Sequence, residues 1–238
     1  MVYNWLKNNL SLRGLLRPAC LLCDAPAESH RLCNGCLHDL PWNLHACDTC
    51  ALPLPEGLSR CGDCRARAPL QSTAVAPLRY AFPVDGLVSG LKYRRQLAHA
   101  PALGELLRDA VIAAERPAPD LLLPVPLHVS RLRERGCNQA LELSRPLARH
   151  FGLVPETRLL QRERATAAQM ALSADARRRN LRRAFTLDAQ RLVTLGHPKR
   201  IAIVDDVLTT GATVQAIATL LHQHGVEDIE VWVVARTP

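Results

Sequence analysis

The sequence predicts an α/β fold, in which a parallel β-sheet flanked by helices follows a small cysteine-rich zinc-ribbon domain. In the C-terminal part, apolar runs of strand length alternate with helix-like stretches, which is typical of βαβ units and a parallel sheet. Eight of the nine cysteines lie before residue 65, in four C-x-x-C pairs, and this spacing is typical of zinc sites. We therefore expect a zinc domain at residues 1–68 and a sheet domain at residues 72–238.

The bulk composition is that of an ordinary globular protein, with 48% hydrophobic and 22% charged residues. No apolar run reaches the length of about 18 residues that crosses a bilayer. The N-terminal stretch has scattered charges and lacks the apolar core of a signal peptide. We therefore expect a cytoplasmic protein without a transmembrane segment. The formal net charge is +8, and it falls to about +4 if eight thiolates bind two zinc ions.

The paired cysteines indicate metal and not disulfides, because the cytoplasm keeps thiols reduced. The pairs are Cys20/Cys23, Cys33/Cys36, Cys47/Cys50 and Cys61/Cys64. A C-x-x-C turn offers two sulfurs as two corners of a tetrahedron, so eight thiolates suit about two zinc ions. The spacing fits a sequential arrangement, in which neighbouring C-x-x-C pairs share a metal ion. It also fits an interleaved arrangement, in which the first and third pairs share one. Because four thiolates close each site, we expect the zinc to be structural.

The sheet domain should contain three clear strands and three clear helices. Apolar runs predict strands at residues 121–125, 201–204 and 229–235, and helical periodicity predicts helices at 103–115, 138–151 and 211–225. The alternation of these segments favours ligand binding at the carboxyl edge of the sheet, as in open α/β proteins.

The segment from residue 201 to residue 221 is the most informative part of the chain. A buried strand ends in Asp205 and Asp206, and a loop of small residues follows and opens into a helix. Loop N–H groups and the helix N-terminus suit a phosphate, and the two carboxylates suit ribose hydroxyls. The candidate phosphate and ribose residues are Asp205, Asp206, Thr209, Thr210, Gly211, Ala212 and Thr213.

This segment resembles the 5-phosphoribosyl-1-pyrophosphate motif of type I phosphoribosyltransferases, which has four hydrophobic residues, two acids and a loop with T-T-G. The wider chain is similar to the ComF/GntX family, whose members carry a double zinc ribbon before a phosphoribosyltransferase-like domain. Further stretches that carry the resemblance are LKYRR at 91–95, PVPLHVSRLRERGCNQA at 124–140 and RERATAAQMALSADARRRNLRRAF at 162–185. The family usually has Phe where this chain has Cys137.

The resemblance implies two further loops around the ligand. The loop from Pro126 to Asn138 matches the one that holds pyrophosphate, and the loop from Arg162 to Phe185 matches the mobile catalytic loop. Their candidate residues are Arg131, Arg133, Arg135, Gly136 and Asn138 in the first, and Gln169, Arg178 and Asn180 in the second. Guanidinium groups suit pyrophosphate oxygens, although a solvated basic loop has the same composition. Lys92 is either an anion ligand or a lysine on a helix surface.

The resemblance also implies what the protein does, and it leaves two classes of function open. In the first, Asp205 and Asp206 are catalytic residues that orient the ribose while Mg²⁺ bridges ribose and pyrophosphate oxygens, and pyrophosphate is displaced by an unknown acceptor. In the second, the protein binds single-stranded DNA and keeps the phosphoribosyl site for ligand sensing. The family context is the uptake or use of external DNA (competence), with DNA-uptake machinery at the inner membrane as a partner. The arginine-rich stretch suits a nucleic-acid backbone.

Overall fold

The computed structural model describes residues 18–163 and 184–238. The chain divides into two compact units, one up to Leu40 and one from Pro41 to Pro238. In the first unit, two short antiparallel bridges join Ala19 to Pro26 and Ser29 to Leu32, and the helix α3 (Asn34–His38) follows. The sequence predicts a domain boundary near residue 70, where the composition changes, and this boundary stays a prediction.

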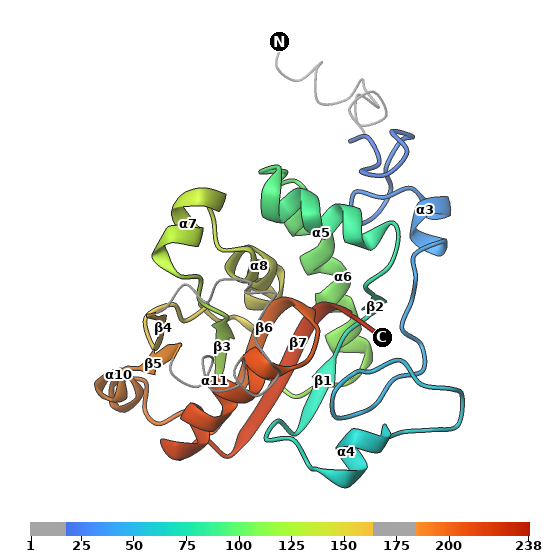
Figure 1. Ribbon diagram of the computed structural model, residues 1–238. Coiled ribbons are helices and arrows are strands. Elements are labelled where there is room, and N and C mark those ends of the chain that lie inside the picture. Colours follow the sequence, from blue (N-terminus) through green and yellow to red (C-terminus); the bar gives the residue numbers. More distant parts are fainter. Residues whose placement is uncertain (1–17, 164–183) are drawn as a thin grey trace, which may run out of the picture. The chain divides into compact units, whose positions relative to one another are not determined.

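The second unit is built around a five-stranded parallel sheet with the order β1-β7-β6-β3, in which β2 also pairs with β7 (Figure 1). Its strands are β1 (Thr73–Val75), β2 (Leu78–Arg79), β3 (Leu121–Pro124), β6 (Arg200–Leu208) and β7 (Asp228–Arg236), and all the pairings are parallel. A separate antiparallel pair joins β4 (Leu160–Arg162) to β5 (Phe185–Leu187). The parallel sheet that the sequence predicts is therefore confirmed.

The three predicted helices are confirmed, and the structure adds others. Within residues 41–163 and 184–238, the helices are α4 (Gly62–Ala66), α5 (Val84–Tyr93), α6 (His99–Ala113), α7 (Val129–Arg135), α8 (Gln139–Phe151), α10 (Ala189–Thr194) and α11 (Ala212–Gln223). Helix α7 lies within the segment expected to be a loop. It forms because His128 accepts a hydrogen bond from the Ser130 N–H at its start, and Gly136 ends it with a left-handed φ of 81°. None of the helices in the described ranges is long and apolar enough to span a membrane.

The two faces of the sheet are covered by different helices, with α6 and α8 on one side and α11 on the other (Figure 1). Ile201 and Ile203 of β6 belong to the core cluster that contains Val214 and Ile217 of α11. Because side chains alternate along a strand, Ala202 and Val204 point to the opposite face. Both faces are buried, which explains why these strands read as continuous apolar runs.

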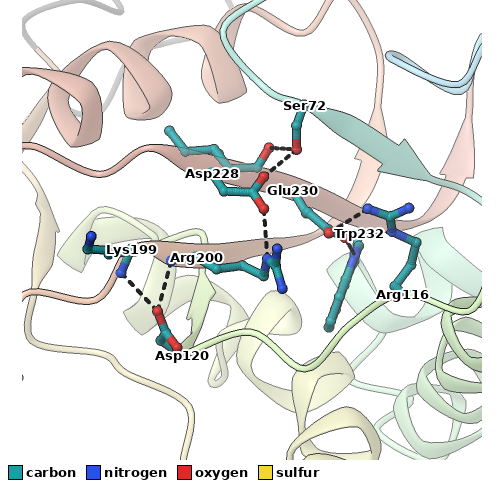
Figure 2. A network of polar contacts seen from close by, with 9 residues as sticks. Ser72, Arg116, Asp120, Lys199, Arg200, Asp228, Glu230 and Trp232 are labelled. Carbon is teal, nitrogen blue, oxygen red and sulfur yellow. Dashed lines mark hydrogen bonds and ion pairs between the residues drawn. The ribbon is translucent and has the colours of Figure 1, made fainter.

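Polar contacts join the amino ends of the strands (Figure 2). Asp120 accepts hydrogen bonds from the backbone N–H groups of Lys199 and Arg200, each at 2.9 Å. Asp228 accepts from the Ser72 hydroxyl at 2.6 Å and from Arg200 Nε at 2.7 Å. These contacts fix the starts of β6 and β7.

Candidate functional site

The candidate site lies at the carboxyl edge, where β6 extends beyond β3. The pairing of β3 with β6 ends at Pro124 and Val204, whereas the pairing of β7 with β6 continues to Arg236 and Leu208. The expectation that the strand stops at Val204 is therefore wrong. Asp205 and Asp206 lie inside β6, because β7 continues to supply hydrogen-bond partners to that part of the strand.

Asp206 forms an ion pair with Lys92, which lies in the last turn of α5. The distance from Lys92 Nζ to Asp206 Oδ1 is 2.7 Å, and the side chains are only 20% and 10% exposed. Burial lowers the pKa of Lys92, whereas the negative charges of Asp206 and, to a smaller extent, Asp205 raise it. The charges prevail, so the pKa lies above its ordinary value. Lys92 is therefore a charged and largely buried part of this edge, and not a solvated lysine on a helix surface.

Asp205 has a different environment from its neighbour. Its Oδ1 accepts a hydrogen bond from the Asp206 N–H at 2.8 Å. Burial and the nearby Asp206 carboxylate raise the pKa of Asp205 to about 7, against the opposing effects of that N–H, Lys92 and Arg162. The Asp205 carboxyl thus titrates near neutral pH, and pKa values shifted in this way are common at functional sites.

Arginine side chains gather near Asp205. Arg162 is the last residue of β4, and burial lowers its pKa. The nearby positive charges of Arg131 and Arg135 lower this pKa further, whereas the negative charge of Asp205 opposes the decrease. The Arg162 guanidinium carbon lies 5.4 Å from the centre of the Phe185 ring, and that of Arg135 lies 5.4 Å from the centre of the Tyr93 ring. Arg162 of β4 therefore interacts with Asp205, and two arginines of α7 lie near Arg162. This positive charge suits an anionic ligand.

The loop that follows β6 joins this strand to α11 and contains the candidate phosphate residues. Thr209 and Thr210 are exposed, and Gly211 adopts φ 74°, a left-handed conformation that favours glycine. The Ala212 N–H, at the start of α11, lies 3.4 Å from Thr210 Oγ1. The N–H groups of the first turn of a helix have no partners within the helix, so this terminus can bind an anion.

The eight paired cysteines form two groups of four. One consists of Cys20, Cys23, Cys33 and Cys36, and the other of Cys47, Cys50, Cys61 and Cys64; within each group the sulfurs lie within 4.8 Å of one another. The pairing is thus sequential. Backbone N–H groups point at sulfurs, as from Cys36 to Cys33 and from Cys64 to Cys61, both at 3.4 Å. Burial raises the pKa of Cys47, but such N–H groups lower it to about 7, which suits the thiolate that zinc requires.

Comparisons with known proteins agree with this architecture. Residues 11–65 match the double zinc ribbon domain, and residues 138–238 match the phosphoribosyl transferase domain. The DNA utilization protein YhgH of Salmonella typhi is 38% identical over 92% of this chain and 96% of its own length. The chain belongs to the ComF/GntX family. The YhgH protein of Escherichia coli K12 is 41% identical, and Competence protein F of Haemophilus influenzae is 37% identical, each over 66% of this chain and 69% of its own length.

The structure shows where most of the other candidate residues of this ComF/GntX chain lie. Arg131 and Arg135 lie one helical turn apart on α7, whereas Arg133 is exposed. Asn138 caps α8, since its Oδ1 accepts from the Ala140 N–H at 3.0 Å and its Nδ2 donates to Val125 O at 3.1 Å. Gln169, Arg178 and Asn180 lie outside the described residues.

Arg162 was missed as a site residue by sequence reasoning, which treated it only as the start of an arginine-rich loop. The available signal was its place two residues after the adjacent Leu159 and Leu160, which are both buried. The backbone of Arg162 is fixed by its pairing with Phe185 of β5, unlike that of an arginine in the middle of a basic loop.

The two zinc-ribbon sites lead to the first prediction. Purified protein should contain about two zinc ions per chain, because each group of four thiolates forms one closed tetrahedron. Elemental analysis measures the zinc, and titration with a thiol reagent should find the eight paired cysteines protected until a chelator is added. A zinc content below one per chain, together with freely reacting thiols, would contradict the assignment.

Proposed function

We propose that this protein binds 5-phosphoribosyl-1-pyrophosphate with Mg²⁺ at the carboxyl edge of its sheet. The observation that carries the proposal is the order of groups along β6 and α11, where two carboxylates, a threonine-rich turn and a helix N-terminus follow one another. A ribose 5-phosphate presents vicinal hydroxyls and a dianion at its two ends. The carboxylates suit the hydroxyls, and the turn suits the phosphate.

The pyrophosphate group would lie toward the basic side chains of Arg131, Arg135 and Arg162. Charge-assisted hydrogen bonds from guanidinium groups to phosphate oxygens are strong and often bidentate. Mg²⁺, when bound, would neutralise part of the pyrophosphate charge, and Asp205 and Asp206 offer the oxygen ligands that it prefers. The Lys92 ammonium also supports the proposal, because its ion pair with Asp206 holds that side chain in a fixed position at this edge of the sheet.

Binding and catalysis are separate questions at this site. In a transfer reaction, the bond between C1 of the ribose and a pyrophosphate oxygen breaks, and a bond from C1 to an acceptor nucleophile forms. Measurement of pyrophosphate release with and without nucleobases or single-stranded DNA separates the two classes. Release that depends on an acceptor identifies a transferase, whereas ligand binding without release identifies a binding protein.

The pKa of Asp205 leads to a prediction for the pH dependence of binding. The ligand and Mg²⁺ need the ionised carboxylate, and this carboxyl has a pKa raised to about 7. The affinity should therefore reach its maximum at a pH well above 7, where Asp205 is fully ionised, and fall by up to about tenfold for each pH unit below 7. Calorimetric titrations over this range compare wild type with Asp205→Asn. The variant should keep only the pH dependence of the ligand's own phosphates, and identical slopes for both proteins would contradict the assignment.

We further propose that the protein acts in the uptake or use of external DNA in the cytoplasm. Relatives named DNA utilization protein and Competence protein F support this context. From Arg158 to Arg183 the chain has eight arginines and only two acidic residues, Glu163 and Asp175. Such a density of positive charge favours a nucleic-acid backbone without sequence preference.

Single-stranded DNA should bind with a steep salt dependence. Changing Arg177, Arg178 and Arg179 to alanine should weaken binding about tenfold and reduce the salt slope by about one for each phosphate that is no longer neutralised. Fluorescence anisotropy at two salt concentrations measures both effects. The matched control changes three exposed arginines of the second zinc ribbon, Arg60, Arg65 and Arg67, which removes the same charge. Equal effects in both variants, or no binding by wild type at low salt, would exclude a specific DNA surface in this stretch.

A further inference from the structure

The second zinc site is hydrogen-bonded to the sheet through the backbone of its first C-x-x-C turn, residues 47–50. Asp48 O accepts from Thr73 Oγ1 at 2.6 Å and from the Ala74 N–H at 3.2 Å. Thr49 O accepts from Gln71 Nε2 at 3.4 Å, and Cys50 O accepts from Arg236 Nε at 3.1 Å. Three successive carbonyls of this turn therefore have partners in or beside β1 and β7.

One of these partners, Arg236, also holds the start of the phosphate loop. Its Nη1 donates to Leu208 O at 3.1 Å, and the neighbouring Thr237 N–H donates to the same carbonyl at 3.1 Å. Leu208 is the last residue of β6 and directly precedes Thr209. A single guanidinium group thus joins the zinc-binding turn to the residue from which the phosphate loop begins.

A second partner, Gln71, reaches the other end of the phosphate loop. It is only 5% exposed, and its Oε1 accepts from Gln215 Nε2 at 2.5 Å. Gln215 lies in the first turn of α11, where its N–H donates to Gly211 O at 2.9 Å. Ala51, directly after the zinc-binding turn, is buried in the same core cluster as Leu208 and Val214. Both ends of the phosphate loop are therefore connected to the zinc-binding turn.

We infer that the second zinc site is the structural support of the phosphate loop, so that metal at Cys47, Cys50, Cys61 and Cys64 sets the affinity for the phosphorylated ligand. Four thiolates hold a C-x-x-C turn in one shape only while the metal neutralises and joins them. When the metal leaves, the three carbonyls no longer have fixed positions, and Arg236 and Gln71 no longer hold the loop. The inference rests on the proposed function only in that the loop binds a phosphate.

The test compares equivalent changes in the two zinc sites of the full chain. Cys47→Ser with Cys50→Ser removes the second metal, and Cys20→Ser with Cys23→Ser removes the first, as elemental analysis should show. Hydrogen exchange of the amides at residues 209–215 and calorimetric titration with 5-phosphoribosyl-1-pyrophosphate and Mg²⁺ are the readouts. In the second-site variant we expect exchange about tenfold faster and affinity about tenfold lower, with changes within about twofold in the first-site variant. Equal changes in both variants, or none in either, would overturn the inference.

A milder variant keeps the test decisive if the cysteine changes unfold the second unit. Arg236→Met should keep both zinc ions, yet still speed exchange in the loop and weaken ligand binding about tenfold. The control Arg149→Met removes an exposed arginine of α8 and should change neither readout. If wild type does not bind the ligand but the loop exchanges faster in Arg236→Met, the proposed function fails and the structural support stands. If wild type binds and Arg236→Met changes neither readout, the inference fails.

Discussion

Replacing both Asp205 and Asp206 by alanine is expected to weaken binding of 5-phosphoribosyl-1-pyrophosphate about 100-fold or more. The two carboxylates are the hydroxyl acceptors in the proposed site, and the removal of two charge-assisted hydrogen bonds costs roughly 3–6 kcal/mol. Calorimetry with Mg²⁺ measures the change in affinity. An equal affinity in the double variant and in wild type would exclude these residues from the site.

Two further variants make this result specific. Because Asp206 pairs with Lys92, its removal leaves a largely buried ammonium unpaired, and thermal unfolding must show that the double variant still folds. Asp205→Asn with Asp206→Asn keeps the packing volume and should also lower the affinity. Thr210→Val should weaken binding less, because the backbone donors of the loop remain.

Replacing Arg116 by methionine is expected to lower the free energy of unfolding by about 3–5 kcal/mol. Glu230 is fully buried within β7, and it accepts hydrogen bonds from Arg116 Nη2 at 2.7 Å and from Trp232 Nε1 at 2.9 Å (Figure 2). Without the guanidinium, the Glu230 carboxylate is a buried charge with no compensating cation. Urea unfolding measures the change.

The control for Arg116 is an ion pair with similar geometry but greater exposure. Arg145 lies 2.7 Å from Glu142 on α8, and its side chain is 56% exposed, so Arg145→Met should cost at most about 1 kcal/mol. Adding Glu230→Gln to Arg116→Met removes the buried charge and should recover part of the stability. If Arg116→Met is no more destabilising than Arg145→Met, Glu230 does not depend on this partner.

The parts of the site that lie close together in the sequence could be predicted, and those assembled by the fold could not. The strand, the two acids, the phosphate loop and α11 are contiguous, so their order was readable from the residues. The ion pair between Lys92 and Asp206 joins residues far apart in the chain, and no local pattern distinguishes it from a surface lysine. The electrostatic interaction of Arg162 with Asp205 likewise joins residues that are far apart in the chain.

The limits of β6 and the pairing of the cysteines show why tertiary context decides such details. Apolar runs mark where a strand is buried, but β6 continues to Leu208 because β7 pairs with it that far. Cysteine spacing predicts that four sulfurs meet, but only the path of the chain shows that neighbouring pairs share a site. The hydrogen bond between Cys50 O and Arg236 depends on the same packing, and no motif in the sequence indicates it.

The most direct test of the proposed function is a calorimetric titration of the wild-type chain with 5-phosphoribosyl-1-pyrophosphate in the presence and absence of Mg²⁺. Ribose 5-phosphate and pyrophosphate are titrated separately under the same conditions. The proposal predicts saturable binding of one ligand per chain, tighter with Mg²⁺ and tighter than either fragment alone, because the phosphate loop, the carboxylates and the arginines act together. No binding at ligand concentrations up to about 1 mM, or binding no tighter than that of pyrophosphate alone, would contradict it.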